Sequence, residues 1–158
     1  MFPVISLPGH AYLFADRVRR VDDFTARPVI IDTHNCELIT PTFTTRSTLA
    51  LANGMEFFSA MSPQEILSAL DVAQQQAYDL QANPLAVSDR ILIDPMRIVA
   101  ILPYIAQLCG YTEEHGYCIQ RLCQAPHCLI IMNDGDTCLA VKDTPAELVD
   151  RLRNTLQG

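Results

Sequence analysis

Two segments of the chain begin with the same pattern of polar and apolar residues. Residues 62–66 read Ser-Pro-Gln-Glu-Ile and residues 144–148 read Thr-Pro-Ala-Glu-Leu. In each, a hydroxyl residue stands at the N-cap, proline at the first helical position and glutamate at the third, which together form a capping box. Apolar residues then recur every three or four positions, as on one face of a helix. The stripes are Ile66, Leu70, Ala73, Ala77 and Leu80 in the first segment, and Leu148, Leu152 and Leu156 in the second.

Short apolar runs before each of these segments predict β-hairpins. Asn-Gly and Asp-Gly are favoured hairpin turns, and each lies between two such runs. Residues 47–52 have an alternative interpretation as a helix ended by Gly54, because the segment is too short for its periodicity to decide. The runs are residues 49–52 and 55–58 around Asn53-Gly54, and residues 129–132 and 137–141 around Asp134-Gly135.

Further elements follow from weaker signals. In the first half we expect a strand from Tyr12 that continues to Phe24, and a hairpin made by residues 28–32 and 37–40. In the second half we expect strands at residues 91–94 and 98–101. A helix is predicted from Pro103 to Leu108, because proline suits the first helical turn and Gly110 would end it.

The repeated pattern predicts an α+β protein made of two tandem units. Asp16–Val21 also matches Asp94–Val99, and Gln81–Pro84 has the composition of a joint. We therefore expect one small β-rich unit over residues 1–83 and another over 84–158. Each would contain a strand, a connection, a hairpin and a helix, and the two would pack as a pseudo-symmetric pair in one compact body.

Composition narrows the class of protein. Apolar residues make up 49% of the 158 residues and charged residues 18%, which is typical of a globular chain. No apolar run is long enough to span a membrane, and the first residues lack the basic start of a signal peptide. We expect a cytoplasmic protein without a membrane partner.

The net charge of −7 disfavours non-specific binding to nucleic acid, which needs clustered cations. One basic cluster, Arg17, Arg19 and Arg20, is followed one residue later by two aspartates, Asp22 and Asp23.

Several segments of the second half follow one another in a recognisable order: Arg97–Ile101, Gly116–Ile119, Leu129–Asp134, Pro145 and Arg151-Leu152. In this order the second half resembles the RemA-type matrix regulators, and more distantly the flagellar regulator FlbD. The resemblance implies a small β-rich unit that assembles side by side into rings and binds DNA through arginines before the hairpin. Those arginines are absent: residues 124–128 read Gln-Ala-Pro-His-Cys, and only Arg121 is near. The resemblance therefore supports the fold and self-association more than DNA contact.

Five potential metal ligands lie within fourteen residues of the second half. Thiolates and imidazoles are the ligands that zinc prefers. The spacing contains no Cys-x2-Cys pair, however, and buried cysteines behave as small hydrophobic residues. We therefore favour a core role for the cysteines and keep a zinc site as the alternative. The set is His115, Cys118, Cys123, His127 and Cys128.

No pattern indicates an enzyme. His34 and Cys36 could share a strand face, but no third group would orient the pair. Asp134-Gly135-Asp136 lacks the other ligands of a calcium loop and is expected to be a turn. Phosphate-binding glycine loops and zinc-protease motifs do not occur in the sequence. The threonine-rich residues 40–48 form either an ordinary loop or a recognition loop anchored by Phe43 and Arg46.

We therefore expect a non-enzymatic regulatory or adaptor protein that forms oligomers and binds another macromolecule, with a protein as the favoured partner. A sequence-specific DNA-binding regulator that uses Arg17, Arg19, Arg20 and Arg46 is one alternative. A metal- or small-molecule-binding module built on the second-half cysteines is the other. No cofactor is expected in the favoured case.

Overall fold

The structure, a computed structural model, describes part of the chain. The described residues are 4–7, 10–15, 17–18, 29–32, 36–41, 47–51, 54–59, 61–66, 68, 81–82, 85–88, 91–154 and 156–157. The side chains it describes lie between Ser47 and Asn154.

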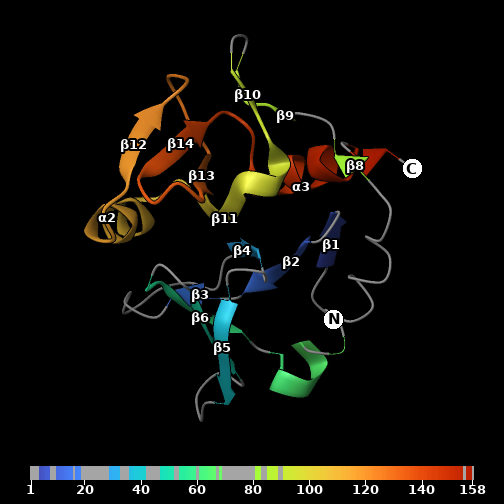
Figure 1. Ribbon diagram of the computed structural model, residues 1–158. Helices are drawn as coiled ribbons and strands as arrows, with labels where there is room; N and C mark the ends of the chain where they lie inside the picture. The colour runs from blue at the N-terminus through green and yellow to red at the C-terminus, as the bar shows by residue number, and fades with distance from the viewer. Residues whose placement is uncertain are drawn as a thin grey trace.

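The largest element is a seven-stranded sheet that takes strands from both halves of the chain (Figure 1). All neighbouring strands run antiparallel, except that β12 runs parallel to β14. The sheet thus continues across the predicted boundary at residues 83 and 84. Its spatial order is β1 (Val4–Leu7), β2 (His10–Ala15), β4 (Val29–Asp32), β11 (Ile98–Pro103), β13 (Cys128–Met132), β14 (Thr137–Val141) and β12 (Cys118–Arg121).

Three smaller sheets complete the strands that the structure describes. The first has four strands, in the order β3 (Arg17–Val18), β7 (Glu56–Ser59), β6 (Ser47–Leu51) and β5 (Cys36–Pro41). The second pairs β9 (Leu85–Ala86) with β10 (Leu92–Ile93), and the third pairs β8 (Gln81–Ala82) with β15 (Leu156–Gln157).

Both predicted capping boxes are present. The hydroxyl oxygen of Ser62 accepts the N–H of Glu65 at 3.2 Å, and that of Thr144 accepts the N–H of Glu147 at the same distance. Each hydroxyl also donates to the glutamate carboxylate, at 3.1 Å. Residues 63–66 are helical after the first box, while the predicted stripe from Leu70 to Leu80 lies outside the described residues. Helix α3 (Pro145–Asn154) follows the second box, but Leu156, predicted on its apolar stripe, lies beyond the helix in a strand that pairs with residues 81 and 82.

Both predicted hairpins before these helices are confirmed. Strands β6 and β7 pair on either side of Gly54, and β13 and β14 pair on either side of Gly135. The two glycines have φ of +89° and +90°, a backbone conformation that glycine adopts without steric cost. Residues 47–51 form a strand, so the alternative helical interpretation of this segment is wrong.

The predicted hairpin of residues 28–32 and 37–40 is wrong. Both segments are strands, but β4 pairs with β2 and β11, whereas β5 pairs with β6 in the other sheet. The predicted strand from Tyr12 to Phe24 is also not a single strand of one sheet, since β2 pairs with β1 and β4 whereas β3 pairs with β7. Residues 19–24 lie outside the described residues.

The helix predicted at residues 103–108 forms later in the chain. Helix α2 spans Ala106–Glu114, while Pro103 ends β11 by pairing with Cys128. Gly110 lies within the helix, where a glycine costs only about 1 kcal/mol relative to alanine. The helix ends before Gly116, which has a φ of +90° and whose N–H donates to the carbonyl of Glu113. A positive-φ glycine after the last turn is a usual helix stop.

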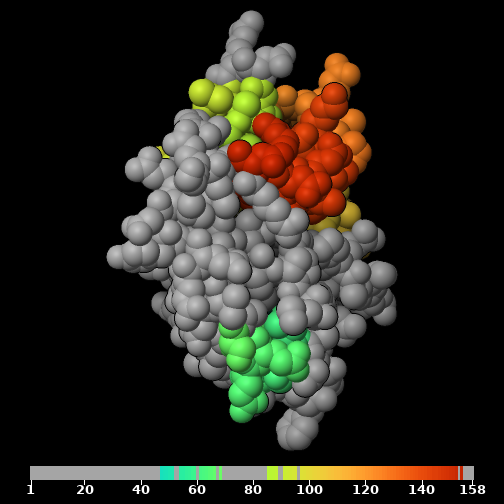
Figure 2. Space-filling model, turned by 90° about the vertical axis from the view of Figure 1, so that its right-hand side faces the viewer, coloured from blue at the N-terminus to red at the C-terminus, as the bar shows by residue number. Residues whose placement is uncertain are grey.

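Buried side chains form two clusters on opposite faces of the second-half strands. One cluster combines α2 and these strands with first-half residues Leu49, Leu51, Met55, Phe57, Met61 and Ile66. The other joins the strands to α3 and the β9–β10 segment, which lie side by side on the face seen in Figure 2. In β11, a register shift between Ile98 and Ala100 places the consecutive residues Val99 and Ala100 in the first cluster. Because the first cluster contains residues from both halves of the chain, it forms one core that the halves share.

The fold is accordingly a mixed α+β arrangement, as the sequence predicts. Among the residues described, none of the helices has the length and apolar character needed to cross a membrane.

Candidate functional site: a cleft beside helix α3

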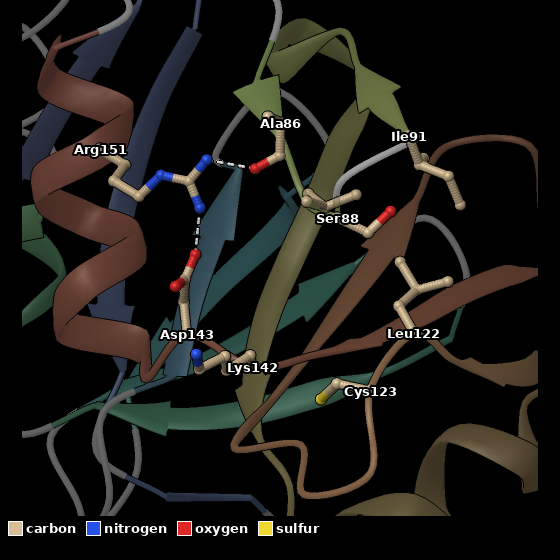
Figure 3. Close-up of a pocket in the computed structure, with 9 residues that line it drawn as sticks. Ala86, Ser88, Ile91, Leu122, Cys123, Lys142, Asp143 and Arg151 are labelled. Carbon is tan, nitrogen blue, oxygen red and sulfur yellow. Dashed lines mark hydrogen bonds and ion pairs between the residues drawn. The ribbon is translucent and has the colours of Figure 1, made fainter.

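A cleft of about 680 Å³ opens where three loops and α3 meet (Figure 3). One wall is β9 with the residues after it, represented by Ala86 and Ser88. The opposite wall is the connection from β12 to β13, which contributes Leu122 and Cys123. The volume lies in the range of small-molecule sites, about 300–1,000 Å³.

Arg151 of α3 holds two sides of the cleft together. Its guanidinium donates to the carboxylate of Asp143, just before the α3 N-cap, and to the carbonyl oxygen of Ala86 in β9 (Figure 3). Asp143 is 21% exposed and Arg151 37% exposed, so water partly screens the ion pair. Exposed pairs contribute only about 0–1 kcal/mol, so the main effect of Arg151 is to fix the geometry.

Lys142 adds a second cation to the cleft. It is the only lysine in the sequence, it follows β14 directly, and its side chain is exposed. Its backbone carbonyl accepts a hydrogen bond from Nδ1 of His127 at 2.9 Å, when that nitrogen carries the proton. The bond ties the connection before β13 to the end of β14, and thereby holds the position of Lys142.

The side of the cleft that lies away from Arg151 in Figure 3 is formed by two apolar residues. Ile91 and Leu122 are half-buried and pack against the core cluster that α3 covers. Leu92, which follows Ile91 and is the first residue of β10, is 67% exposed. Small-molecule sites combine apolar side chains with a few polar groups, and this cleft offers both.

The five predicted metal ligands are not brought together. No group of three or more potential ligands is placed to hold a metal ion within the described residues. Cys118 pairs with Thr137 and Cys128 pairs with Val141, four positions further along β14, which is about 13 Å at strand spacing. A single zinc ion, with bonds of about 2.3 Å to sulfur, cannot reach both.

His115 has a structural role instead. Its Nδ1 lies 2.9 Å from the carbonyl oxygen of Tyr111, and the two rings meet edge to face with centroids 4.5 Å apart. The ring also lies next to the turn at Gly54. Cys123 is the one member of the predicted metal set that lines the cleft, and His127 acts on the cleft through its bond to Lys142. Zinc binding stays a prediction that this arrangement does not support.

The buried cysteines are suited to a core role rather than to reactivity. Cys128 and Cys138 have no exposed surface. Burial raises the pKa of the Cys138 thiol to about 12, and burial also raises the pKa of Cys128 well above its usual range. Because the thiolate is the nucleophile and the metal ligand, neither residue is activated for such chemistry.

The structure does not describe how most of the predicted arginine and phenylalanine binding residues lie relative to one another. Arg19, Arg20, Phe43 and Arg46 lie outside the described residues, and for Arg17 the structure describes only the backbone, in β3. Arg121 lies on β12 with an exposed side chain, and its guanidinium donates to the carbonyl oxygen of Gln124 at 2.7 Å.

The sequence patterns do not indicate the cleft residues Ala86, Lys142, Asp143 and Arg151 as a site. A local signal was present, since a unique Lys-Asp pair directly precedes the α3 capping box. The partner Ala86 lies 65 positions before Arg151 and contributes only a backbone oxygen, which no side-chain pattern reveals.

No known protein family matches the chain, and neither a curated protein nor a solved structure shows significant similarity to it.

Proposed function

We propose that this protein is a non-enzymatic adaptor or regulator that binds other protein chains, including copies of itself, along the outer edge of β12. The observation that carries the proposal is that β12 ends the seven-stranded sheet. An edge strand offers unpaired main-chain donors and acceptors to a further strand.

The hydrogen bonds of β12 identify which groups face outward. The N–H of Cys118 donates to Asp136 and that of Leu122 donates to Ala140, both at 2.9 Å. In a parallel ladder alternate residues bond the same neighbour, so the main-chain groups of Ile119 and Arg121 face away from β14. A partner strand placed there would extend the sheet by one member.

Side chains on this edge favour a protein partner over DNA. Cys118, Gln120 and Arg121 are exposed and carry one positive charge among them. The described guanidinium groups all have acceptors within the chain: Arg97 donates to Asn133, and Arg121 and Arg151 have the partners given above. The net charge of the chain is −7, and the described residues of the β12 edge offer no cluster of cations that could bind the phosphates of DNA.

The proposal includes a scaffold of two related units. In support, β5, β6, β7 and the helix at residue 63 follow in the same order and near the same spacing as β12, β13, β14 and α3. The flanking strands differ, because β5 pairs with β6, whereas β12 pairs with β14 rather than with β13. A single chain with two such units would resemble two neighbouring members of a RemA-type assembly, which makes side-by-side association the expected mode.

Proline substitution at the edge tests the proposal. Arg121→Pro removes an outward N–H and leaves the ladder bonds to β14, because proline is tolerated where its nitrogen faces solvent. Arg121→Ala is the matched control, since it also removes the guanidinium but keeps the N–H. We expect native mass spectrometry to show oligomers for the wild type and the alanine variant, and a shift toward monomer for the proline variant.

Equal oligomer populations in the two variants, or a monomeric wild type that captures no partner chain, would contradict the edge-strand proposal. The DNA alternative has its own readout, a salt-sensitive mobility shift on duplex DNA that weakens when Arg19 and Arg20 are replaced.

A further inference from the structure

The charged residues that line the α3 cleft leave a surplus of one positive charge. Lys142 and Arg151 are cationic and Asp143 is anionic, and these are the charged residues that line it. Arg151 presents five N–H donors, of which the bonds to Asp143 and Ala86 use two. Its remaining donors are held in a fixed position, so binding a further acceptor there requires little loss of side-chain freedom.

Of the two cations, Lys142 has the side chain that can change conformation when a ligand binds. Within the part of the chain that the structure describes, Arg151 and Asp143 form an ion pair and Lys142 forms none. Lys142 and Asp143 lie side by side below Arg151 in Figure 3. A cation on a flexible stem next to a fixed guanidinium can close on the second oxygen of a bound anion.

From this arrangement we propose that the cleft binds a small organic monocarboxylate with an apolar body. The carboxylate would lie between Lys142 and Arg151, and the apolar body would contact Val87, Ile91 and Leu122. A surplus of one charge matches one carboxylate. A phosphate dianion would exceed that surplus, and Asp143 would repel its two charges more strongly than the single charge of a carboxylate. The charged residues that carry this site, Lys142 and Arg151, lie outside β12 and are not altered by the edge-strand variants, so either proposal can fail without the other.

The unique lysine provides the direct readout. Reductive methylation with ¹³C-formaldehyde labels Lys142 and the N-terminal amine, whose signals separate in a ¹H–¹³C spectrum. We expect benzoate and hexanoate, titrated at constant ionic strength, to shift the Lys142 signal in a saturable way. Benzyl alcohol, which has an apolar body but no carboxylate, is expected to bind at least about tenfold more weakly, since it lacks a charge-assisted hydrogen bond.

Calorimetric titration of the unlabelled protein tests the residues. We expect Lys142→Met to weaken benzoate binding about tenfold, the effect of losing one charge-assisted contact. Arg97→Gln is the matched control, because it removes an exposed cation outside the cleft and is expected to leave the affinity unchanged. Far-UV circular dichroism verifies that both variants are folded.

A free acid and the C-terminus of a peptide offer the same carboxylate chemistry. Acetyl-Ala-Ala-Leu and its C-terminal amide separate these sources. Tighter binding of the peptide acid than of hexanoate would assign the site to peptide termini and overturn the free-acid form of the proposal. Equal binding of benzoate and benzyl alcohol, no saturable shift of Lys142, or an unchanged affinity in Lys142→Met would overturn the site itself.

Discussion

At the level of single residues, burial decides the chemistry of the cysteines. The sequence offers Cys128 both as a zinc ligand and as a small core residue, and the structure places it with no exposed surface beside α3. Cys138, on the next strand, faces the opposite cluster, which contains residues of both halves. Alternation along a strand accounts for these positions, whereas the spacing of the cysteines in the sequence does not.

Because of the buried Cys138 thiol, we expect the free energy of unfolding to depend on pH in the alkaline range. Burial raises its pKa to about 12 in the folded protein, while a free thiol has a pKa of about 8.5. Below the pKa of the unfolded chain, the thiol keeps its proton in both the folded and the unfolded state, so its contribution to the free energy of unfolding is fully present. Above that pKa the unfolded chain loses the proton first, so stability falls as pH rises, by at most about 1.4 kcal/mol per pH unit.

Urea unfolding between pH 8 and 10.5 measures this slope. Cys138→Ala is less stable at pH 8, because it leaves a cavity, but its stability should fall less steeply with pH than that of the wild type. Cys118→Ala, which removes an exposed thiol, is the matched variant. Parallel pH slopes for Cys138→Ala and the wild type would refute the expectation.

At the level of elements, structures encoded by neighbouring residues are predicted correctly, whereas the pairing of strands far apart in the sequence is not. The two capped helices and the two glycine-turn hairpins depend on residues within a few positions of each other, and the sequence predicts all four. Helix α2 has no such signal at its start, because its N-cap Ile105 makes no side-chain hydrogen bond. The partners of β4 were mispredicted for a related reason: β11 lies about seventy positions away, and no turn residue encodes that pairing.

Loss of the α3 cap is expected to be measurable. Thr144→Ala removes the oxygen that accepts the N–H of Glu147 and should lower the free energy of unfolding by about 1 kcal/mol. Thr144→Ser retains that oxygen and should remain within a few tenths of a kcal/mol of the wild type. Urea denaturation measures both, and an equal loss in the serine variant would show that the methyl group, rather than the cap, matters.

At the level of the whole molecule, the two halves share one core. Phe57 from the first half and Tyr111 from the second meet edge to face, with ring centroids 6.2 Å apart. The Tyr111 hydroxyl accepts the N–H of Glu56 at 2.8 Å and lies 3.3 Å from the carbonyl oxygen of the same residue. Helix α2 thus bonds the backbone of β7 directly, a contact that internal repetition alone does not predict.

Removal of that hydroxyl tests the coupling between the halves. We expect Tyr111→Phe to lower the free energy of unfolding by about 1–2 kcal/mol, because a partly buried N–H loses this acceptor. Tyr104→Phe removes a half-buried tyrosine hydroxyl for which the structure describes no bond, and should change stability by less than about 0.5 kcal/mol. Unfolding should remain a single transition in both variants. Two separate transitions would show that the halves fold independently.

The pairing of β4 with β11 also affects how the chain folds during synthesis. Strand β4, through which β1 and β2 join the sheet, pairs with a strand that is translated about seventy residues later. At roughly 5–20 residues per second, the first strands leave the ribosome several seconds before their neighbour exists. During that interval the open side of β4 can pair with other chains, so the yield of folded protein should depend on translation rate and on chaperones that bind nascent chains.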